Sequence, residues 1–177
     1  MGFREITVDE LDFNFITELR DRYSIVAATD PGRSDGCPAD GGHTNMLTAA
    51  WAQVGHLWQR PVCTVYIRPS RFTREFIDAS GRFTVSFVEG HDAELYLLGR
   101  TSGRDCDKLA QTGLTLASHR GDPVFEEAKL VLVCRTVYRQ PVDFGCIVDE
   151  SVHADHYNGR ETSIQYIGEI ERVLVRG

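Results

Sequence analysis

Alternation of apolar and polar residues is the dominant pattern along the chain, and it predicts β-strands. In RFTVSFV, residues 82–88, phenylalanine and valine alternate with threonine and serine, which is the two-residue period of a strand with one buried face. SIQYIGEIERVLV, residues 163–175, separates isoleucine and tyrosine from glutamine and glutamate in the same way. AKLVLVCRTVYR, residues 128–139, is apolar on both faces in its first half, so we expect it at the centre of a sheet.

Three shorter segments, YSIVAAT, NMLTAAW and VCTVYIR, complete a set of about six strands, which is typical of a barrel or a sandwich. The predicted helices are few and short. TREFIDASG begins at Thr73, a good N-cap residue, and ends at Gly81, a good C-cap residue. HDAELYLLG and GRDCDKLAQTG have a similar form, and the turn-rich residues 29–45 predict an exposed loop.

Length and composition place this pattern in one domain of 177 residues with an ordinary apolar content of 42%. The net charge of −7 argues against nucleic acid as the main partner. The start of the chain is charged, and no apolar run reaches membrane-spanning length, so we expect neither a signal peptide nor a membrane partner. Five widely spread cysteines without a C-x-x-C pair indicate a reduced, cytoplasmic protein.

The first segment with candidate chemistry is RPSRFTREF, in which Arg68 and Arg71 flank Ser70, and Thr73 starts the predicted helix. The first amide groups of a helix have no partners within it and attract anions. Two guanidinium groups and two hydroxyl groups around such a helix start make a phosphate site. The alternative is a solvated arginine pair beside an ordinary helix start.

Two other segments carry similar alternatives. In TSGRDCDKLAQTG, Ser102 is a candidate cap and Lys108 lies about one turn into the predicted helix; a capped surface helix explains the same pattern. In NMLTAAW, polar Asn45 and Thr48 stand beside two alanines. Small residues admit a flat ligand to the backbone, whereas a strand packed beneath a helix needs no ligand.

Taken together, TNMLTAAW, RPVCTVYIRPSRFTREFI, GRFTVSFV, GRTSGRDCDKLAQTGL, EAKLVLVCRTVYR and YIGEIERVLV resemble the flavin reductase-like family with the FMN-binding split-barrel fold, close to its flavoredoxin branch. These segments follow the family order and cover most of residues 44–175. The resemblance implies a single flavin reductase-like domain over residues 1–177. It also implies a six-stranded antiparallel split β-barrel with short capping helices, and a homodimer with FMN near the subunit interface.

The resemblance further implies which residues hold the cofactor. The isoalloxazine ring would be lined by Asn45, Met46, Leu47, Thr48, Ala49 and Trp51. The phosphate would be surrounded by Arg68, Ser70, Arg71 and Thr73, and the site would be closed by Ser102, Arg104 and Lys108. The chain departs from the family pattern in the long, glycine-rich loop at residues 30–44, which contains Cys37 and His43.

The main functional hypothesis is an FMN-dependent NAD(P)H:flavin oxidoreductase, in which FMN carries the chemistry and no side chain is assigned a catalytic role. No G-x-G-x-x-G motif follows a strand, so NADH or NADPH would bind transiently over the flavin face. The second hypothesis is a flavoredoxin-like carrier that exchanges electrons with protein partners. The third is a split-barrel protein without a redox role, which a colourless protein would support.

HADHY, residues 153–157, has an H-x-x-H spacing, but a metal site needs a third ligand and the surrounding residues predict turns. We therefore expect no metal here, and a lid in which His156 or Tyr157 meets the reductant is the more attractive reading. FMN is favoured over FAD because no adenine-binding motif is present. The predicted loops offer few large apolar residues to cover a flat ring, so a second subunit is the natural cover.

Overall fold

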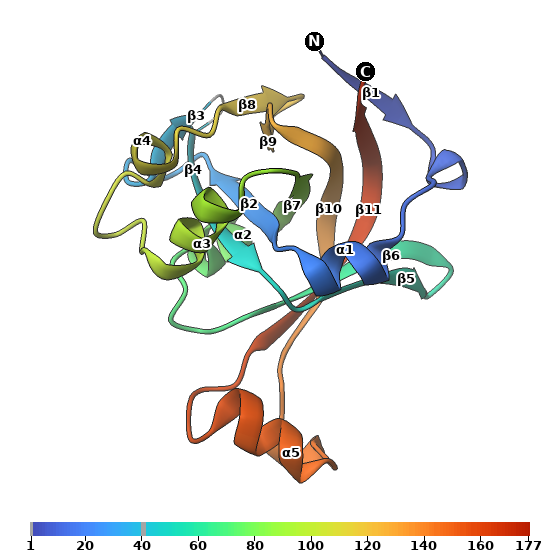
Figure 1. Cartoon of the computed structure of the whole chain (residues 1–177), viewed down its shortest axis with the longest axis vertical. Coiled ribbons are helices and arrows are strands. Elements are labelled where there is room, and N and C mark those ends of the chain that lie inside the picture. The colour runs from blue at the N-terminus through green and yellow to red at the C-terminus, as the bar shows by residue number, and fades with distance from the viewer. Residues whose placement is uncertain (1, 40–41) are drawn as a thin grey trace.

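The computed structural model describes residues 2–39 and 42–177, and antiparallel β-structure dominates it (Figure 1). Among these residues nine strands form one sheet in the order β3-β4-β2-β7-β10-β11-β6-β5, with β1 paired to β11. Their bounds are β1 Phe3–Ile6, β2 Ser24–Asp30, β3 Cys37–Ala39, β4 Gly42–Ala49, β5 Ala52–Leu57, β6 Arg60–Ile67, β7 Arg82–Val88, β10 Ala128–Pro141 and β11 Ile164–Arg176. A separate pair consists of β8 Leu116–His119 and β9 Asp122–Phe125.

The helices are short and lie around the curved sheet (Figure 1). They are α1 Phe15–Asp21, α2 Thr73–Ser80, α3 Asp92–Arg100, α4 Lys108–Thr112 and α5 Glu150–Val152, with 3₁₀ turns at Val8–Glu10 and Phe144–Cys146 and a π-helical turn at His153–Tyr157. Within the described ranges no helix is long and apolar enough to cross a membrane.

The predicted central strand is confirmed, because β10 lies between β7 and β11. Phe83, Val85 and Phe87 of β7 all join the apolar cluster inside the barrel, as their alternation predicts. Gly168 of β11 permits this packing: a Cβ atom there would lie 2.6 Å from the Phe83 ring. A side chain at residue 168 would therefore push the centre of the barrel apart.

A second apolar cluster lies on the other face of the sheet, beneath α3 and the segment that leads to β9. Met46 of β4 packs there with Leu95 and Leu98 of α3 and Phe125 of β9. Neighbouring residues of β4 therefore belong to two cores, since Leu47 and Ala49 face the barrel interior. Both faces of this strand are covered, which explains its mixture of large and small residues.

The expected count of about six strands is too low, and the β5–β6 hairpin shows why. The residues between these strands, Trp58 and Gln59, have left-handed φ angles of 52° and 60°. Such turns normally signal themselves through Asn-Gly or Asp-Gly, and this hairpin has neither. The fold class is nevertheless as predicted, a mainly β, antiparallel barrel.

The exposed loop predicted at residues 29–45 is wrong over much of its length. β2 extends to Asp30, and β3 pairs with β4 through Cys37 and Thr44. Cys37 and Asn45 are buried, because this hairpin lies against α2 and α4 rather than in solvent. Residues 40 and 41 of the predicted loop lie outside the described residues.

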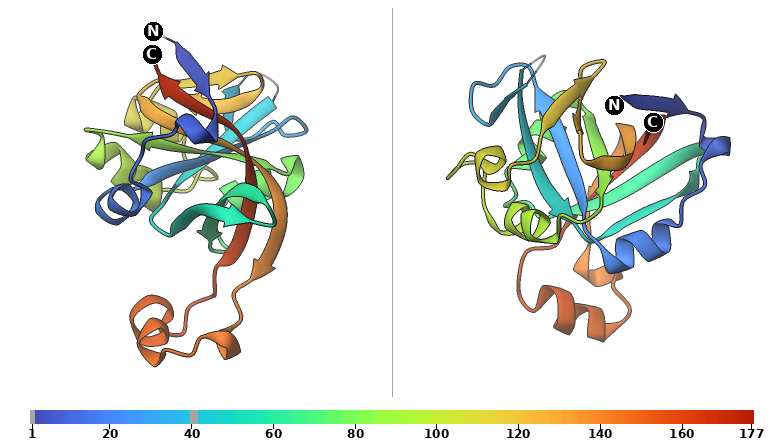
Figure 2. Two further views of the ribbon diagram at one scale, coloured as in Figure 1. Left: turned by 90° about the vertical axis from the view of Figure 1, so that its right-hand side faces the viewer. Right: turned by 45° about the horizontal axis from the view of Figure 1, so that its top comes forward.

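The β10 and β11 strands extend beyond the barrel and carry an extension, residues 142–163, that we call the arm (Figure 2). The sequence predicted turns in this segment, and that prediction is wrong at its tip. Asp149 caps α5 by accepting a hydrogen bond from Ser151 N at 2.9 Å, and the π-helical turn follows directly. π-helical turns are rare in proteins, and those that occur often lie at functional sites.

Candidate functional site

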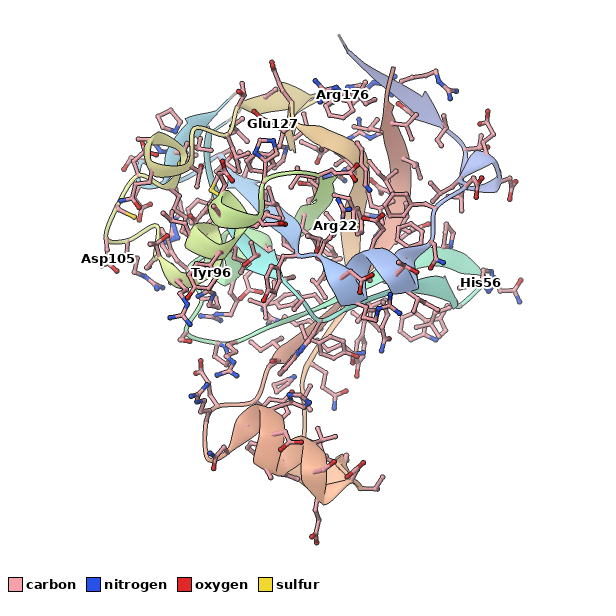
Figure 3. The ribbon with its side chains drawn as sticks, viewed as in Figure 1. Arg22, His56, Tyr96, Asp105, Glu127 and Arg176 are labelled. Atoms are coloured by element: carbon pink, nitrogen blue, oxygen red, sulfur yellow. The ribbon has the colours of Figure 1, made fainter. Side chains whose placement is uncertain are left out.

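A cavity of about 320 Å³ lies where β4, β6, the end of α3 and the base of the arm meet. Its volume is at the lower end of the range for small-molecule sites, roughly 300–1,000 Å³. The cavity is lined by Leu47, Thr48, Ala49, Ala50, Trp51, Tyr66, Ile67, Arg68, Arg71, Gly99 and Ser163. Figure 3 shows side chains in the region where the barrel meets the arm.

The wall formed by β4 depends on a close approach between this strand and α3. A Cβ atom at Gly99 would lie 2.4 Å from the Thr48 hydroxyl oxygen, which is far inside van der Waals contact. Glycine at residue 99 therefore lets the helix end approach the strand. The result is a wall of small side chains, Ala49 and Ala50, with the larger Trp51 at its end.

Arg68 and Arg71 bring two positive charges to the cavity. Arg71 donates to the Gly99 carbonyl oxygen at 2.7 Å, and Arg68 donates to the His156 carbonyl oxygen at 3.2 Å. In the described part of the chain neither guanidinium group has a carboxylate partner. Burial and the charge of Arg68 lower the pKa of Arg71. An anion in the cavity would relieve this repulsion.

Ser163 adds an unsatisfied polar group to the same cavity. This residue is 1% exposed, and its hydroxyl oxygen has no hydrogen-bond partner among the described residues. Buried polar groups are rarely left unpaired because the cost is about 1–3 kcal/mol. A ligand with a hydrogen-bonding edge would satisfy this hydroxyl group.

The arm is attached to the mouth of the cavity by aromatic and polar contacts. The Trp51 ring lies 5.4 Å from the His156 ring and 5.8 Å from the Tyr157 ring, both edge-on. The Glu161 carboxylate accepts hydrogen bonds from the Ser70 amide, at 3.1 Å, and from the Ser70 hydroxyl group. The loops therefore do supply large side chains as a cover, contrary to what their composition predicted.

The family model for the flavin reductase like domain matches residues 19–176. The chain belongs to the flavin reductase-like family. The family predicted from the ordered segments is thus confirmed over almost the whole chain. The comparison with curated proteins gives no match.

Solved structures show the same split-barrel fold. Flavoredoxin of Desulfovibrio vulgaris (Miyazaki F) is 21% identical, with a TM-score of 0.63 over 98% of this chain and 77% of that one. An FMN-binding domain of a flavin reductases-like enzyme from Shewanella baltica OS155 is 20% identical, with a TM-score of 0.63 over 98% and 77%. The NADH:FAD oxidoreductase of Streptomyces globisporus C-1027 is 15% identical, with a TM-score of 0.58 over 87% and 75%.

The structure brings part of the predicted site together on the cavity. The predicted residues that line it are Leu47, Thr48, Ala49, Trp51, Arg68 and Arg71. Five lining residues were missed: Ala50, Tyr66, Ile67, Gly99 and Ser163. The first three stand within or beside the quoted motifs, so the sequence held a signal for them. Gly99 and Ser163 stand at the ends of two other quoted segments, GRTSGRDCDKLAQTGL and SIQYIGEIERVLV, and only the tertiary fold places them at the cavity.

Two other predicted residues lie next to the cavity but bond to each other. Asn45 donates from its side-chain amide to the Thr73 hydroxyl group at 3.0 Å, and both residues are 1% exposed. Thr73 is the first residue of α2, and the N-cap is Phe72, which makes no side-chain capping hydrogen bond. The hydroxyl group that was expected to cap the helix instead accepts from β4.

Of the three residues that were expected to close the site, Ser102 and Arg104 lie in residues 101–107 on the outside of the molecule, where Figure 3 shows Asp105, whereas Lys108 is buried. Arg104 forms an ion pair with Glu75, and its guanidinium carbon lies 4.4 Å from the centre of the Phe72 ring. Ser102 accepts a hydrogen bond from Arg104 N at 3.2 Å. These contacts attach the segment to α2, close to Ser70, whose carbonyl oxygen accepts from Arg104 at 3.3 Å.

The histidines of the arm are not part of a metal cluster. His153 stacks on Phe144 with ring centres 4.9 Å apart, and His156 lies edge-on to Trp51. Over residues 2–39 and 42–177 no group of three or more His, Cys, Asp or Glu side chains could hold a metal ion.

Proposed function

We propose that the cavity binds FMN and that the protein is an oxidoreductase. The observation that carries this proposal is the pair Arg68 and Arg71, which meets the cavity without a carboxylate partner in the described chain. A protein with a net charge of −7 has many carboxylates available to neutralise them. No described carboxylate, Glu161 on Ser70 included, pairs with either arginine. This supports an anionic ligand, and the flavin reductase-like family supports a flavin as that ligand.

The residues of the cavity divide between the two ends of such a ligand. Arg68 and Arg71 would bind the phosphate monoester through charge-assisted hydrogen bonds. The small side chains Ala49 and Ala50 leave room for a flat ring, and Ser163 would donate to its polar edge. FMN is favoured over FAD because two arginines suit one phosphate group and no adenine-binding motif is apparent.

Bound FMN would supply the redox chemistry, accepting a hydride from NADH or NADPH and passing electrons to an acceptor. The chain's own part is to hold the ring and to exclude water. Trp51 and the arm residues His156 and Tyr157 form an aromatic cover at the cavity mouth. We propose that a reduced nicotinamide approaches the ring transiently at this cover, which is the lid expected from the sequence.

The main proposal is therefore an NAD(P)H:flavin oxidoreductase. The alternative is an FMN electron carrier that serves a protein partner without a nicotinamide site of its own, and the likeness to a flavoredoxin favours this second reading. All five cysteines are free, which supports a reducing compartment such as the cytoplasm.

We also propose that the protein is a homodimer. A cavity of about 320 Å³ is at the lower end for a small-molecule site, so part of a flavin ring would lie outside it. A second subunit related by a two-fold axis would cover the remainder and create two equivalent sites. The resemblance of the sequence to its family points to the same arrangement.

The absorption spectrum of the purified protein tests the cofactor, and chromatography of the ligand released by heating identifies it. We expect a yellow protein that releases FMN. A colourless protein that takes up no FMN, or one that releases mainly FAD, would contradict the proposal. Anaerobic addition of NADH or NADPH then separates the two readings: rapid bleaching supports the oxidoreductase, whereas bleaching only by a reduced partner protein supports the carrier.

A further inference from the structure

Lys108, at the start of α4, is a buried lysine with an unusual set of partners. Its side chain is 2% exposed, and its Nζ atom donates to the Met46 carbonyl oxygen at 2.7 Å and to the Leu98 carbonyl oxygen at 3.2 Å. Among the described residues it forms no ion pair. The neighbouring Asp107 is engaged as the N-cap of α4, where it accepts from Leu109 N and Ala110 N.

The two carbonyl groups belong to the two walls of the cavity. Met46 directly precedes the lining residue Leu47 on β4, and Leu98 directly precedes the lining residue Gly99 on α3. Gly99 in turn accepts the hydrogen bond from Arg71 at 2.7 Å. One ammonium group thus joins β4 to α3 behind the cavity, without lining it.

We infer that Lys108 is a positioning residue for the anion site, because it holds the Gly99 carbonyl group where it orients Arg71 towards the cavity. This inference rests on the proposed function. It gives Lys108 a different part from the one the family resemblance implied, since the lysine acts through the backbone and not by touching the cofactor.

Because Lys108 can lose its charge, its role predicts that the affinity for FMN depends on pH. Burial, followed by the repulsion of Arg71, lowers the pKa of Lys108 to about 8. The titratable groups that face it are Arg71, before α2, Cys37 from β3 and Cys106, which precedes α4. An anion beside Arg71 opposes this repulsion and favours the charged ammonium group. Binding of FMN therefore takes up a proton near pH 8, and the affinity falls as the pH rises through that value.

The first experiment compares FMN binding by wild type, Lys108→Met, Lys108→Gln and the control Lys129→Met, using fluorescence titration between pH 7 and 9. Lys129 is the chain's other lysine and pairs with Glu18, outside the cavity. We expect Lys108→Met to bind FMN about tenfold or more weakly at pH 7 and to lose the pH dependence. Lys108→Gln keeps two N–H donors and should recover part of the affinity but not the pH dependence.

The second experiment needs no variant, since the chain contains only two lysines. NMR of the lysine Cε groups follows each amine directly through a pH titration, with and without FMN. We expect the Lys108 signal to titrate near pH 8 in the free protein and at a higher pH in the FMN complex, while Lys129 is unchanged by FMN.

The outcomes separate this inference from the proposed function. A wild type that binds no FMN overturns the proposed function and the inference with it. A wild type that binds FMN overturns the inference alone if Lys108→Met has the same affinity and pH profile. If Lys108→Met does not fold, the wild-type titration decides: a Lys108 signal that is unmoved by FMN overturns the inference.

Discussion

At the scale of single residues, the cavity distinguishes two kinds of arginine. Arg104 is neutralised by Glu75, whereas among the described residues Arg68 and Arg71 donate to carbonyl groups and to no carboxylate. The sequence offers all three arginines as candidates, and only the fold shows which of them remain available to an anion. Asn45 illustrates the same limit: its strand was predicted, but not that Thr73 would take its side-chain amide.

Replacement of the available arginines tests their role. We expect Arg68→Ala to weaken FMN binding by about 1.5–3 kcal/mol, or roughly ten- to a hundredfold, because a charge-assisted contact is lost. Arg71→Ala should weaken it at least as much, since Arg71 is the more buried charge. Arg20→Ala is the matched control, because this exposed arginine forms an ion pair with its neighbour Asp21 and does not line the cavity. Isothermal titration with FMN measures all three, and equal affinity of Arg68→Ala and wild type would remove Arg68 from the phosphate site.

The buried charge of Lys108 also predicts a pH dependence of stability. Its pKa is lowered to about 8 in the folded protein, against about 10.4 in an unfolded chain. Between these values the unfolded chain binds more protons, so the contribution of Lys108 to the free energy of unfolding rises with pH. The whole change amounts to about 3 kcal/mol.

Urea denaturation of wild type and Lys108→Met at pH 7, 9 and 10 measures this contribution of Lys108 to the free energy of unfolding. We expect the difference in the free energy of unfolding to shift in favour of wild type as the pH rises from 8 to 10. The same difference for Lys129→Met should stay flat. A constant difference for Lys108→Met would mean that the lysine has an ordinary pKa in the folded protein.

At the scale of elements, the hydrophobic pattern of the chain predicted the strands better than it predicted the turns and the contacts between elements. β7 has the predicted bounds, and β10 is central, because an apolar run on both faces can only be buried on both sides. The β5–β6 turn and the helical tip of the arm were missed, since Trp58 and Gln59 are not typical turn residues and His153–Tyr157 lacks helical periodicity. The meeting of α3 with β4 could not be read from either segment alone.

The close packing of α3 against β4 depends on Gly99, and replacing this glycine tests it. We expect Gly99→Ala to destabilise the protein by about 1–3 kcal/mol through overpacking and to weaken FMN binding, because the new methyl group meets the Thr48 hydroxyl group. Thr48→Ala in the same chain should restore part of both. Gly55→Ala is the control, since an added methyl group there meets nothing within 4 Å. Thermal unfolding and FMN titration report the result, and a harmless Gly99→Ala would contradict the close approach.

At the scale of the whole molecule, the arm reaches beyond the barrel (Figure 2) and the cavity lies at its base. The proposed homodimer follows from the uncovered part of a flavin ring. An obligate interface should bury at least about 2,000 Å² in total, and bound FMN should raise the apparent stability of the dimer. Sedimentation at low micromolar concentration, with and without FMN, measures this. A monomer that binds FMN tightly and in equal amount would show that one chain builds the complete site.

The central claim is that FMN lies in the cavity between β4, β6 and α3, and a crystal structure of the protein with FMN tests it most directly. We predict the phosphate group within hydrogen-bonding distance of Arg68 and Arg71, with the ring against Leu47, Thr48, Ala49 and Ala50. FMN bound elsewhere on the barrel, or a phosphate group that touches neither arginine, would contradict the account.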